Sequence, residues 1–156
     1  MLTINMLALV RRGNFSTCGR RDFANISIGD HVKAVRSFCY NDVAMFARLS
    51  GDFNPIHLDA AFAKNVFNGP IVHGALINAF ISSLLGTRLP GPGTIAFSQD
   101  VRFPQPLYID EKVQGSVVIS AIKKRFIFCN ISCKVPETEK VVLNGKATVM
   151  LIEKIT

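Results

Sequence analysis

Hydrophobic residues recur with two different periods along this chain, and the change of period separates a helical first half from a strand-rich second half. The second half holds four stretches rich in Val, Ile, Phe and Thr in which apolar and polar residues partly alternate, as in half-buried strands. We expect strands at residues 94–103, 112–122, 126–135 and 141–153, with a hairpin turn at 136–140. Because the connections are too short for parallel crossovers, the pattern predicts antiparallel pairing.

The first half predicts a strand and two short helices before a longer helix. The strand covers residues 31–38, and either Asn41 or Asp42 caps the helix that follows. The apolar face of that helix is made by Val43, Phe46, Ala47 and Leu49. Gly51 ends it, and a turn-rich segment leads to another short helix near residues 60–66.

The longer helix is expected over residues 74–86, which read GALINAFISSLLG. It is apolar almost all the way round, as is typical of a buried helix. The prolines and glycines of residues 89–93 prevent its continuation. One buried helix followed by four long strands predicts a single α+β domain in which one sheet curls around the helix.

The charge of the chain is concentrated at its start. Of the net charge of +7, residues 1–21 supply +4, because they contain four arginines and no acid. An apolar opening followed by arginines, serines and threonines without acids predicts a mitochondrial presequence over residues 1–21, with the folded domain at 22–156 and a location in the matrix. An unstructured basic tail is the alternative. We expect no nucleic-acid partner, because the remaining bases form no run longer than residues 123–125.

Membrane insertion and metal binding are not expected either. The longest mostly apolar stretch, residues 75–85, is too short and too polar to span a bilayer, which needs about 20 residues. The cysteines, at positions 18, 39, 129 and 133, and the three histidines show no spacing typical of a metal site. Cys129 and Cys133 would lie about 13 Å apart in one strand, too far for a disulfide. Free thiols suit a reducing compartment.

The segment Ser50-Gly-Asp-Phe-Asn-Pro-Ile-His57 is the strongest candidate for chemistry. Pro55 keeps Asn54 out of helical geometry, so Asp52 and His57 lie on either side of a turn. A carboxylate and an imidazole in this arrangement can hold one water molecule and exchange protons with two adjacent carbons of a substrate. The alternative is that Asp52 caps a helix and His57 is an ordinary hydrogen-bonded side chain.

This segment resembles the signature of the R-specific enoyl-thioester hydratases of the MaoC-like, hot-dog superfamily, and most closely its mitochondrial 3-hydroxyacyl-thioester dehydratases. The similarity covers roughly residues 28–153 in the same order. It continues through Pro70-Ile-Val-His-Gly74, Ser82-Ser-Leu-Leu-Gly86, Leu89-Pro-Gly-Pro-Gly93 and the spacing of Gln99, Phe103 and Pro106.

The resemblance implies a hot-dog fold, in which a curved antiparallel β-sheet wraps a long buried helix, and a homodimer. It implies reversible dehydration of (3R)-3-hydroxyacyl thioesters to trans-2-enoyl thioesters in mitochondrial fatty-acid synthesis, without a cofactor or a metal. The acyl group would be carried by acyl carrier protein or coenzyme A. The residues do not distinguish between these carriers, and they do not set the acyl chain length.

The resemblance also assigns roles to individual residues. Asp52 and His57 would hold the reactive water, and the backbone N–H of Gly74 would stabilise the negative charge on the thioester oxygen. Asn54 would fix the turn between the catalytic pair, and His73 is expected to be structural.

Ser82 and Leu85 lie one turn apart on the long helix and are expected to face the same way. By resemblance they line the acyl tunnel, although ordinary core packing is an equal alternative. Candidates for the phosphates of the carrier are the cations Arg88, Arg102, Lys123 and Lys124, although a solvated surface charge is the commoner explanation for each.

Three other functions are compatible with parts of the sequence. A hot-dog subunit without activity could bind acyl chains or hold a partner, but such relatives tend to lose Asp52 or His57. Thioesterases of the same fold generally arrange their acidic residue differently. An RNA-associated protein is supported only by the basic start of the chain.

Overall fold

The computed structural model describes residues 26–151, and these residues form one sheet and four helices. In chain order the elements are β1 (His31–Arg36), α1 (Tyr40–Ser50), α2 (Pro55–Leu58), α3 (Ala60–Lys64), α4 (Gly74–Thr87), β2 (Thr94–Arg102), β3 (Val113–Lys123), β4 (Phe126–Val135) and β5 (Lys140–Leu151). The presequence expected at residues 1–21 and Cys18 lie outside the described residues.

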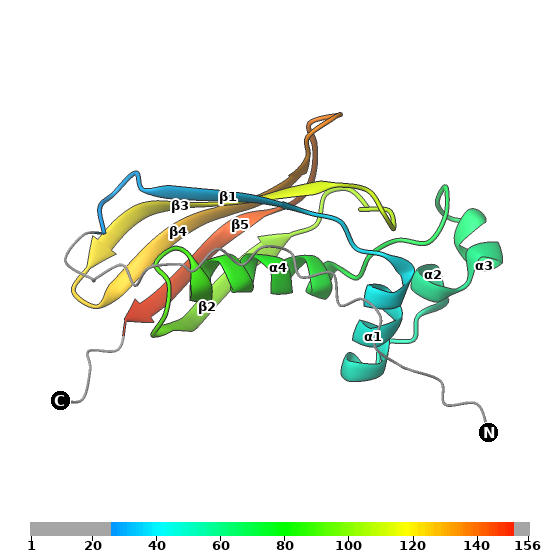
Figure 1. Cartoon of the computed structure of the whole chain (residues 1–156), viewed down its shortest axis with the longest axis horizontal. Helices are drawn as coiled ribbons and strands as arrows, with labels where there is room; N and C mark the ends of the chain where they lie inside the picture. Colours follow the sequence, from blue (N-terminus) through cyan, green and yellow to red (C-terminus); the bar gives the residue numbers. More distant parts are fainter. Residues whose placement is uncertain (1–25, 152–156) are drawn as a thin grey trace, which may run out of the picture.

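The sheet has the strand order β1-β3-β4-β5-β2, and every neighbouring pair is antiparallel. The expected strands and their antiparallel pairing are therefore confirmed. In β3 the side chains of Val113, Val117 and Ile119 point to one face and are buried. That face is the concave one, and α4 lies along it (Figure 1). The α+β expectation of one sheet curled around a helix is confirmed.

Helix α4 is buried on one side only. Its buried residues recur at the spacing of one helical face: Ile77, Phe80, Ile81, Leu84 and Leu85. The opposite side is exposed in the single chain, and it carries Ala75, Ala79 and Ser82. The expectation of burial all the way round is thus wrong for one chain, because the sheet covers only one side of the helix.

The first helix starts earlier than the sequence pattern predicted. Cys39, rather than Asn41 or Asp42, is the N-cap residue. Asp42 lies in the first turn, where its carboxylate accepts the backbone N–H of Cys39 at 3.0 Å. The helix ends as expected at Gly51, whose φ of 79° is left-handed and favours glycine. Leu49 was expected on the buried face but is 85% exposed.

The described cysteines are free thiols, as expected. Cys129 and Cys133 are buried in the core between α4 and the sheet. Burial raises the pKa of Cys129 to about 11 and that of Cys133 to about 12. Both thiols therefore stay protonated and unreactive at neutral pH. No helix among residues 26–151 is both long and apolar enough to cross a membrane.

Candidate active site

A one-turn helix that the sequence pattern missed places the candidate histidine. Helix α2 begins at Pro55, which fits the first helical position because proline lacks an N–H there. Asn54 caps it, since its side-chain oxygen accepts the N–H of Ile56 at 3.4 Å. The backbone N–H of Asn54 in turn donates to Oδ1 of Asp52 at 3.2 Å. Asn54 thus fixes the turn between Asp52 and His57, through its side-chain oxygen and its backbone.

His57 is held in one tautomer. Its side chain is 6% exposed, and Nδ1 lies 2.8 Å from the carbonyl oxygen of Ile71. A carbonyl only accepts, so Nδ1 carries the hydrogen and Nε2 presents a lone pair. Ile71 is itself fixed, because its N–H donates to Ile56 at 3.2 Å and its backbone pairs with Tyr108. The carbonyl that orients His57 therefore belongs to a rigid part of the fold.

The surroundings of His57 favour its neutral form. Burial lowers its pKa from the ordinary value of 6.5. The hydrogen bond to Ile71 and the carboxylate of Asp52 raise the pKa, and the neighbouring His73 lowers it, but the net direction is downward. At neutral pH the imidazole can therefore accept a proton.

His73 joins the pair from the start of α4. It is 1% exposed, and its ring stacks on that of His57 with 3.7 Å between centroids and 26° between planes. Its Nε2 lies 3.1 Å from the backbone oxygen of Asp52, to which it donates. No sequence pattern indicates this contact, because it joins residues 21 positions apart. One side-chain atom from each of Asp52, His57 and His73 lies within 4.8 Å of the other two.

This cluster does not suit a bound metal ion. A tetrahedral ion needs ligand atoms whose lone pairs converge on one point. The Nε2 of His73 is not available as a ligand, because it donates to the backbone oxygen of Asp52. In addition, the Nδ1 of His57 is already used by Ile71.

A cavity of about 290 Å³ opens beside His57 and Gly74. Its walls include the apolar side chains of Ile77, Phe103 and Leu107. Gly74 is the first residue of α4, and no side chain caps that helix. Its N–H has no partner within the helix and can bind an anionic oxygen. A Cβ at this position would lie 3.2 Å from the ring of Phe103, so glycine permits the close packing.

The two residues expected in the acyl tunnel lie in different environments. Leu85 is 3% exposed and packs in the core, whereas Ser82 is exposed. Neither lines the cavity beside His57, to which α4 contributes Gly74 and Ile77. Residues three apart lie about 60° apart around a helix, so Leu85 is at one edge of the buried stripe and Ser82 lies just outside that same edge.

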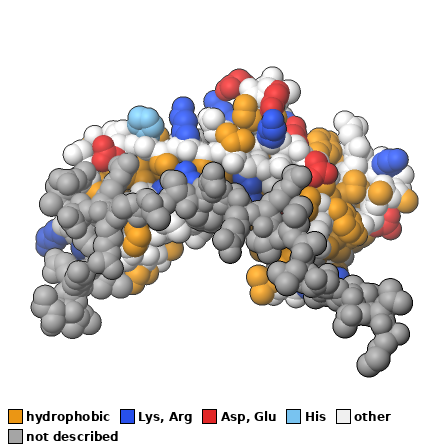
Figure 2. All heavy atoms as spheres, in the orientation of Figure 1, with side chains coloured by type: hydrophobic (Ala, Val, Ile, Leu, Met, Phe, Trp, Pro, Cys, Tyr) orange, Lys and Arg blue, Asp and Glu red, His pale blue; other side chains and the backbone are white. Residues whose placement is uncertain are grey.

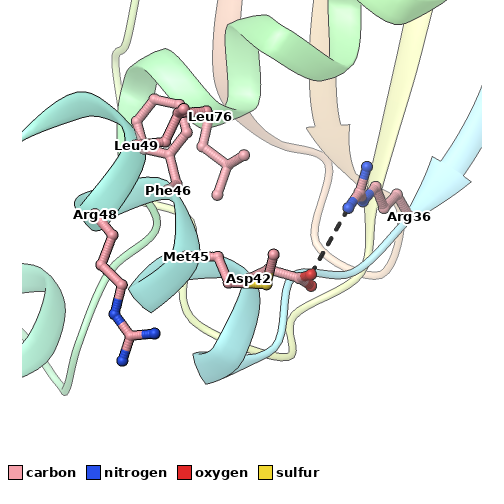
Figure 3. Close-up of a pocket in the computed structure, with 7 residues that line it drawn as sticks. All are labelled: Arg36, Asp42, Met45, Phe46, Arg48, Leu49 and Leu76. Atoms are coloured by element: carbon pink, nitrogen blue, oxygen red, sulfur yellow. Dashed lines mark ion pairs between the residues drawn. The ribbon is translucent and has the colours of Figure 1, made fainter. Parts of the chain in front are cut away.

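A second hollow of about 600 Å³ lies between α1 and the start of α4 (Figure 3). Its apolar lining comes from Met45, Phe46, Leu49 and Leu76, and its charged lining from Arg36, Asp42 and Arg48. Arg36 pairs with Asp42 at 4.0 Å. Phe46 separates this hollow from the site, since its ring centroid is 5.1 Å from that of His73. Figure 2 shows hydrophobic side chains at the surface at this end of the molecule.

The cations expected to bind phosphate are spread over the fold. Arg102 is the last residue of β2 and directly precedes Phe103, which lines the cavity, but Arg102 itself is not among the lining residues. Arg88 follows the last residue of α4, about 20 Å from Gly74 at 1.5 Å per residue. Lys123 and Lys124 lie at the turn between β3 and β4, at the far end of the sheet from α1 to α3 (Figure 1). None of these four cations lines the cavity beside His57.

The model of the MaoC-like domain family matches residues 23–141, which include every element of the site. This chain belongs to the MaoC-like domain family. An (R)-specific enoyl-CoA hydratase of Rhodospirillum rubrum is 38% identical over 132 residues, which cover 83% of this chain and 90% of that relative. A mitochondrial 3-hydroxyacyl-[acyl-carrier-protein] dehydratase of Arabidopsis thaliana is 29% identical over 131 residues, covering 81% of this chain and 78% of the relative.

Solved structures agree with this membership. The (R)-hydratase of Aeromonas caviae involved in PHA biosynthesis superposes with a TM-score of 0.79 and 34% identity, covering 82% of this chain and 98% of that one. The hot-dog fold expected from the resemblance is confirmed. The chain is a hydro-lyase of the hydratase and dehydratase class.

Proposed function

We propose that this chain catalyses the reversible dehydration of (3R)-3-hydroxyacyl thioesters to trans-2-enoyl thioesters in mitochondrial fatty-acid synthesis. The observation that carries the proposal is the arrangement of Asp52, His57 and Gly74. His57 and Gly74 line the same cavity, the Nε2 of His57 presents a lone pair, and a carboxylate oxygen of Asp52 lies within 4.8 Å of a ring nitrogen of His57.

In the hydration direction the pair activates a water molecule. The lone pair of His57 Nε2 accepts a proton as the water oxygen bonds to C3 of the enoyl thioester, and a proton is delivered to C2. In dehydration the C2 proton is removed and the C3 hydroxyl leaves as water. Asp52 lies within 4.8 Å of His57 and helps to hold this water, and its carboxylate makes His57 a better proton acceptor.

The reaction also requires that the negative charge on the thioester oxygen be stabilised. When the C2 proton leaves, or when water adds to C3, the thioester becomes enolate-like and its oxygen gains negative charge. The N–H of Gly74 at the N-terminus of α4 is a fixed donor for that oxygen, and the helix dipole has the favourable sign. The apolar walls of the cavity exclude water and strengthen both effects.

A location in the mitochondrial matrix is supported by residues 1–21, which carry four arginines and no acid, and by similarity to the mitochondrial plant dehydratase. A fusion of residues 1–30 to a fluorescent reporter is expected to enter mitochondria. A diffuse cytosolic signal would remove this part of the proposal.

A homodimer is supported by two uncovered surfaces. The composition of α4 is apolar on both sides, yet Ala75 and Ala79 are exposed in the single chain. The neighbouring edge strand β2 exposes Ile95 and Phe97, which are 41% and 65% accessible. An apolar edge strand is usually covered in the assembled protein. A second copy, with a thioester of acyl carrier protein or coenzyme A as substrate, is the partner that we propose.

The decisive experiment is turnover by purified residues 22–156. We expect a dimer in light scattering that consumes the conjugated absorbance of a trans-2-enoyl thioester, with the R-3-hydroxyacyl thioester as the product in chiral analysis. A folded dimer without turnover on coenzyme A or carrier-protein substrates would favour the silent acyl-binding subunit. An S product would contradict the stereochemistry that we propose.

A further inference from the structure

We propose that His73 is a positioning residue that sets the distance and angle between Asp52 and His57. It does so through two contacts made by one ring. Its Nε2 donates to the backbone oxygen of Asp52 at 3.1 Å, and its face stacks on the ring of His57 at 3.7 Å. One side chain thus touches both members of the catalytic pair, without itself facing the substrate cavity.

The catalytic pair needs such a support because its own segments are short. Asp52 lies in an exposed stretch without regular structure, and its other hydrogen bonds are to Ser50 and Asn54, both within two residues. His57 lies on a helix of only four residues. A single helical turn is not stable by itself in water. Local contacts alone therefore do not fix the distance between Asp52 and His57.

His73, by contrast, is anchored in the most rigid part of the site. It precedes α4, a 14-residue helix that packs against the sheet. Its backbone oxygen accepts the N–H groups of Leu76 and Ile77 at 3.0 and 3.1 Å. Its ring is 1% exposed and lies against Phe46 of α1. The ring can therefore transmit the position of α4 to Asp52 and His57.

The polar character of His73 also points to a role beyond packing. Its Nδ1 is buried without a hydrogen-bond partner among the described residues. An unpartnered buried nitrogen destabilises the folded state, so an apolar side chain of the same size would serve packing better. A buried polar atom that lowers stability in this way is expected where the residue has a functional role. The donor to Asp52 is what an apolar side chain could not supply.

Three substitutions separate the two contacts. His73→Gln keeps a donor of similar reach but loses the ring, His73→Phe keeps a ring but loses the donor, and His73→Leu loses both. A shift of about 1 Å in catalytic geometry costs about 100-fold in rate. For the enoyl-thioester hydration that we propose, we expect kcat to fall about 100-fold in the Leu variant with KM nearly unchanged. The Gln and Phe variants should lie in between.

A control separates positioning from loss of stability. Phe38→Leu removes part of a fully buried ring outside the site and should lower the melting temperature while leaving kcat unchanged. The role of His73 is overturned if the folded Leu variant keeps kcat within twofold of the wild type. It is also overturned if the kcat of the Gln and Phe variants is no higher than that of the Leu variant.

A second measurement does not depend on turnover, so a failure of the proposed function can be told apart from a failure of this inference. Hydrogen exchange at the amides of Asn54, Ile56 and His57 reports the turn that carries the pair. We expect at least tenfold faster exchange in the Leu variant and near wild-type protection in the Gln variant. Equal exchange in Leu and wild-type proteins would show that His73 does not hold the turn.

Discussion

Replacing His57 by alanine is expected to lower kcat for enoyl-thioester hydration by about 10² to 10⁴-fold, the range that general acid–base catalysis supplies. The variant loses the Nε2 lone pair that accepts the proton of the attacking water. Asp52→Asn is expected to have an effect of similar size, because the amide keeps the shape of the side chain but not its charge. KM should change little in either variant, since these groups act on the reacting atoms.

Matched controls exist for both substitutions. His31→Ala removes an exposed histidine of β1, and Asp59→Asn changes the N-cap residue of α3 to another good N-cap residue. Both are expected to keep wild-type kcat and melting temperature. If either Asp52→Asn or His57→Ala keeps more than a tenth of the wild-type kcat, that residue does not take part in the proposed chemistry.

The pH profile provides a further check on His57. Only the neutral imidazole can accept a proton, so activity is lost as the pH falls through the pKa of this residue. Burial lowers that pKa, and we therefore expect the acidic limb of kcat/KM to have its midpoint below 6.5. A midpoint above 6.5 would contradict the finding that burial dominates the pKa of His57.

Gly145→Ala is expected to be the most damaging single change to the fold, at about 3 kcal/mol or more of the free energy of unfolding. Gly145 lies on β5 opposite Val101 of β2. A Cβ there would overlap the backbone oxygen of Asp100 and lie 2.9 Å from the Cα of Val101. Because both obstacles are main chain, β2 itself would have to move. The change can be measured by urea denaturation.

Gly115→Ala is the control for this effect. A Cβ at Gly115 would also be too close to its neighbours, at 2.8 Å from the Phe80 ring and 3.0 Å from a methyl group of Leu84. These are the ends of side chains on α4, which can shift by rotation, so we expect a smaller loss of about 1 kcal/mol. Equal losses of unfolding free energy in the two variants would show that β2 moves away from β5 more easily than the close contacts at Gly145 indicate.

The bounds of the strands could be predicted closely, because the signal for each strand lies within its own sequence. Each strand is rich in β-branched and aromatic residues and ends at turn residues, and β4 was placed at residues 126–135, where the structure has it. Helix α1 was placed late because Cys39 is an unusual N-cap residue and Asp42 resembles one. Helix α2 was missed because four residues carry no period.

The residues of the candidate site could be proposed from the sequence where they belong to a motif, but not where only the fold brings them together. Asp52, His57 and Gly74 were recognised through the motifs that contain them. The role of Ile71 as the acceptor for His57 and the contact of His73 with Asp52 arise only from the folded chain. Likewise, Phe103 joins the cavity because the end of β2 packs against the start of α4. Such long-range contacts leave no periodic pattern for sequence analysis to detect.

The candidate reactive groups, and Ile71 and His73 that contact them, all lie between Asp52 and Gly74, whereas the sheet supports α4 and adds Val142 to the wall of the cavity. In evolutionary terms, the two parts are free to change under different constraints. Strand positions can exchange one apolar residue for another as long as alternation and the close contacts of glycine are kept. The segment that carries the chemistry can be inherited as one unit, because a single continuous stretch of coding sequence specifies it.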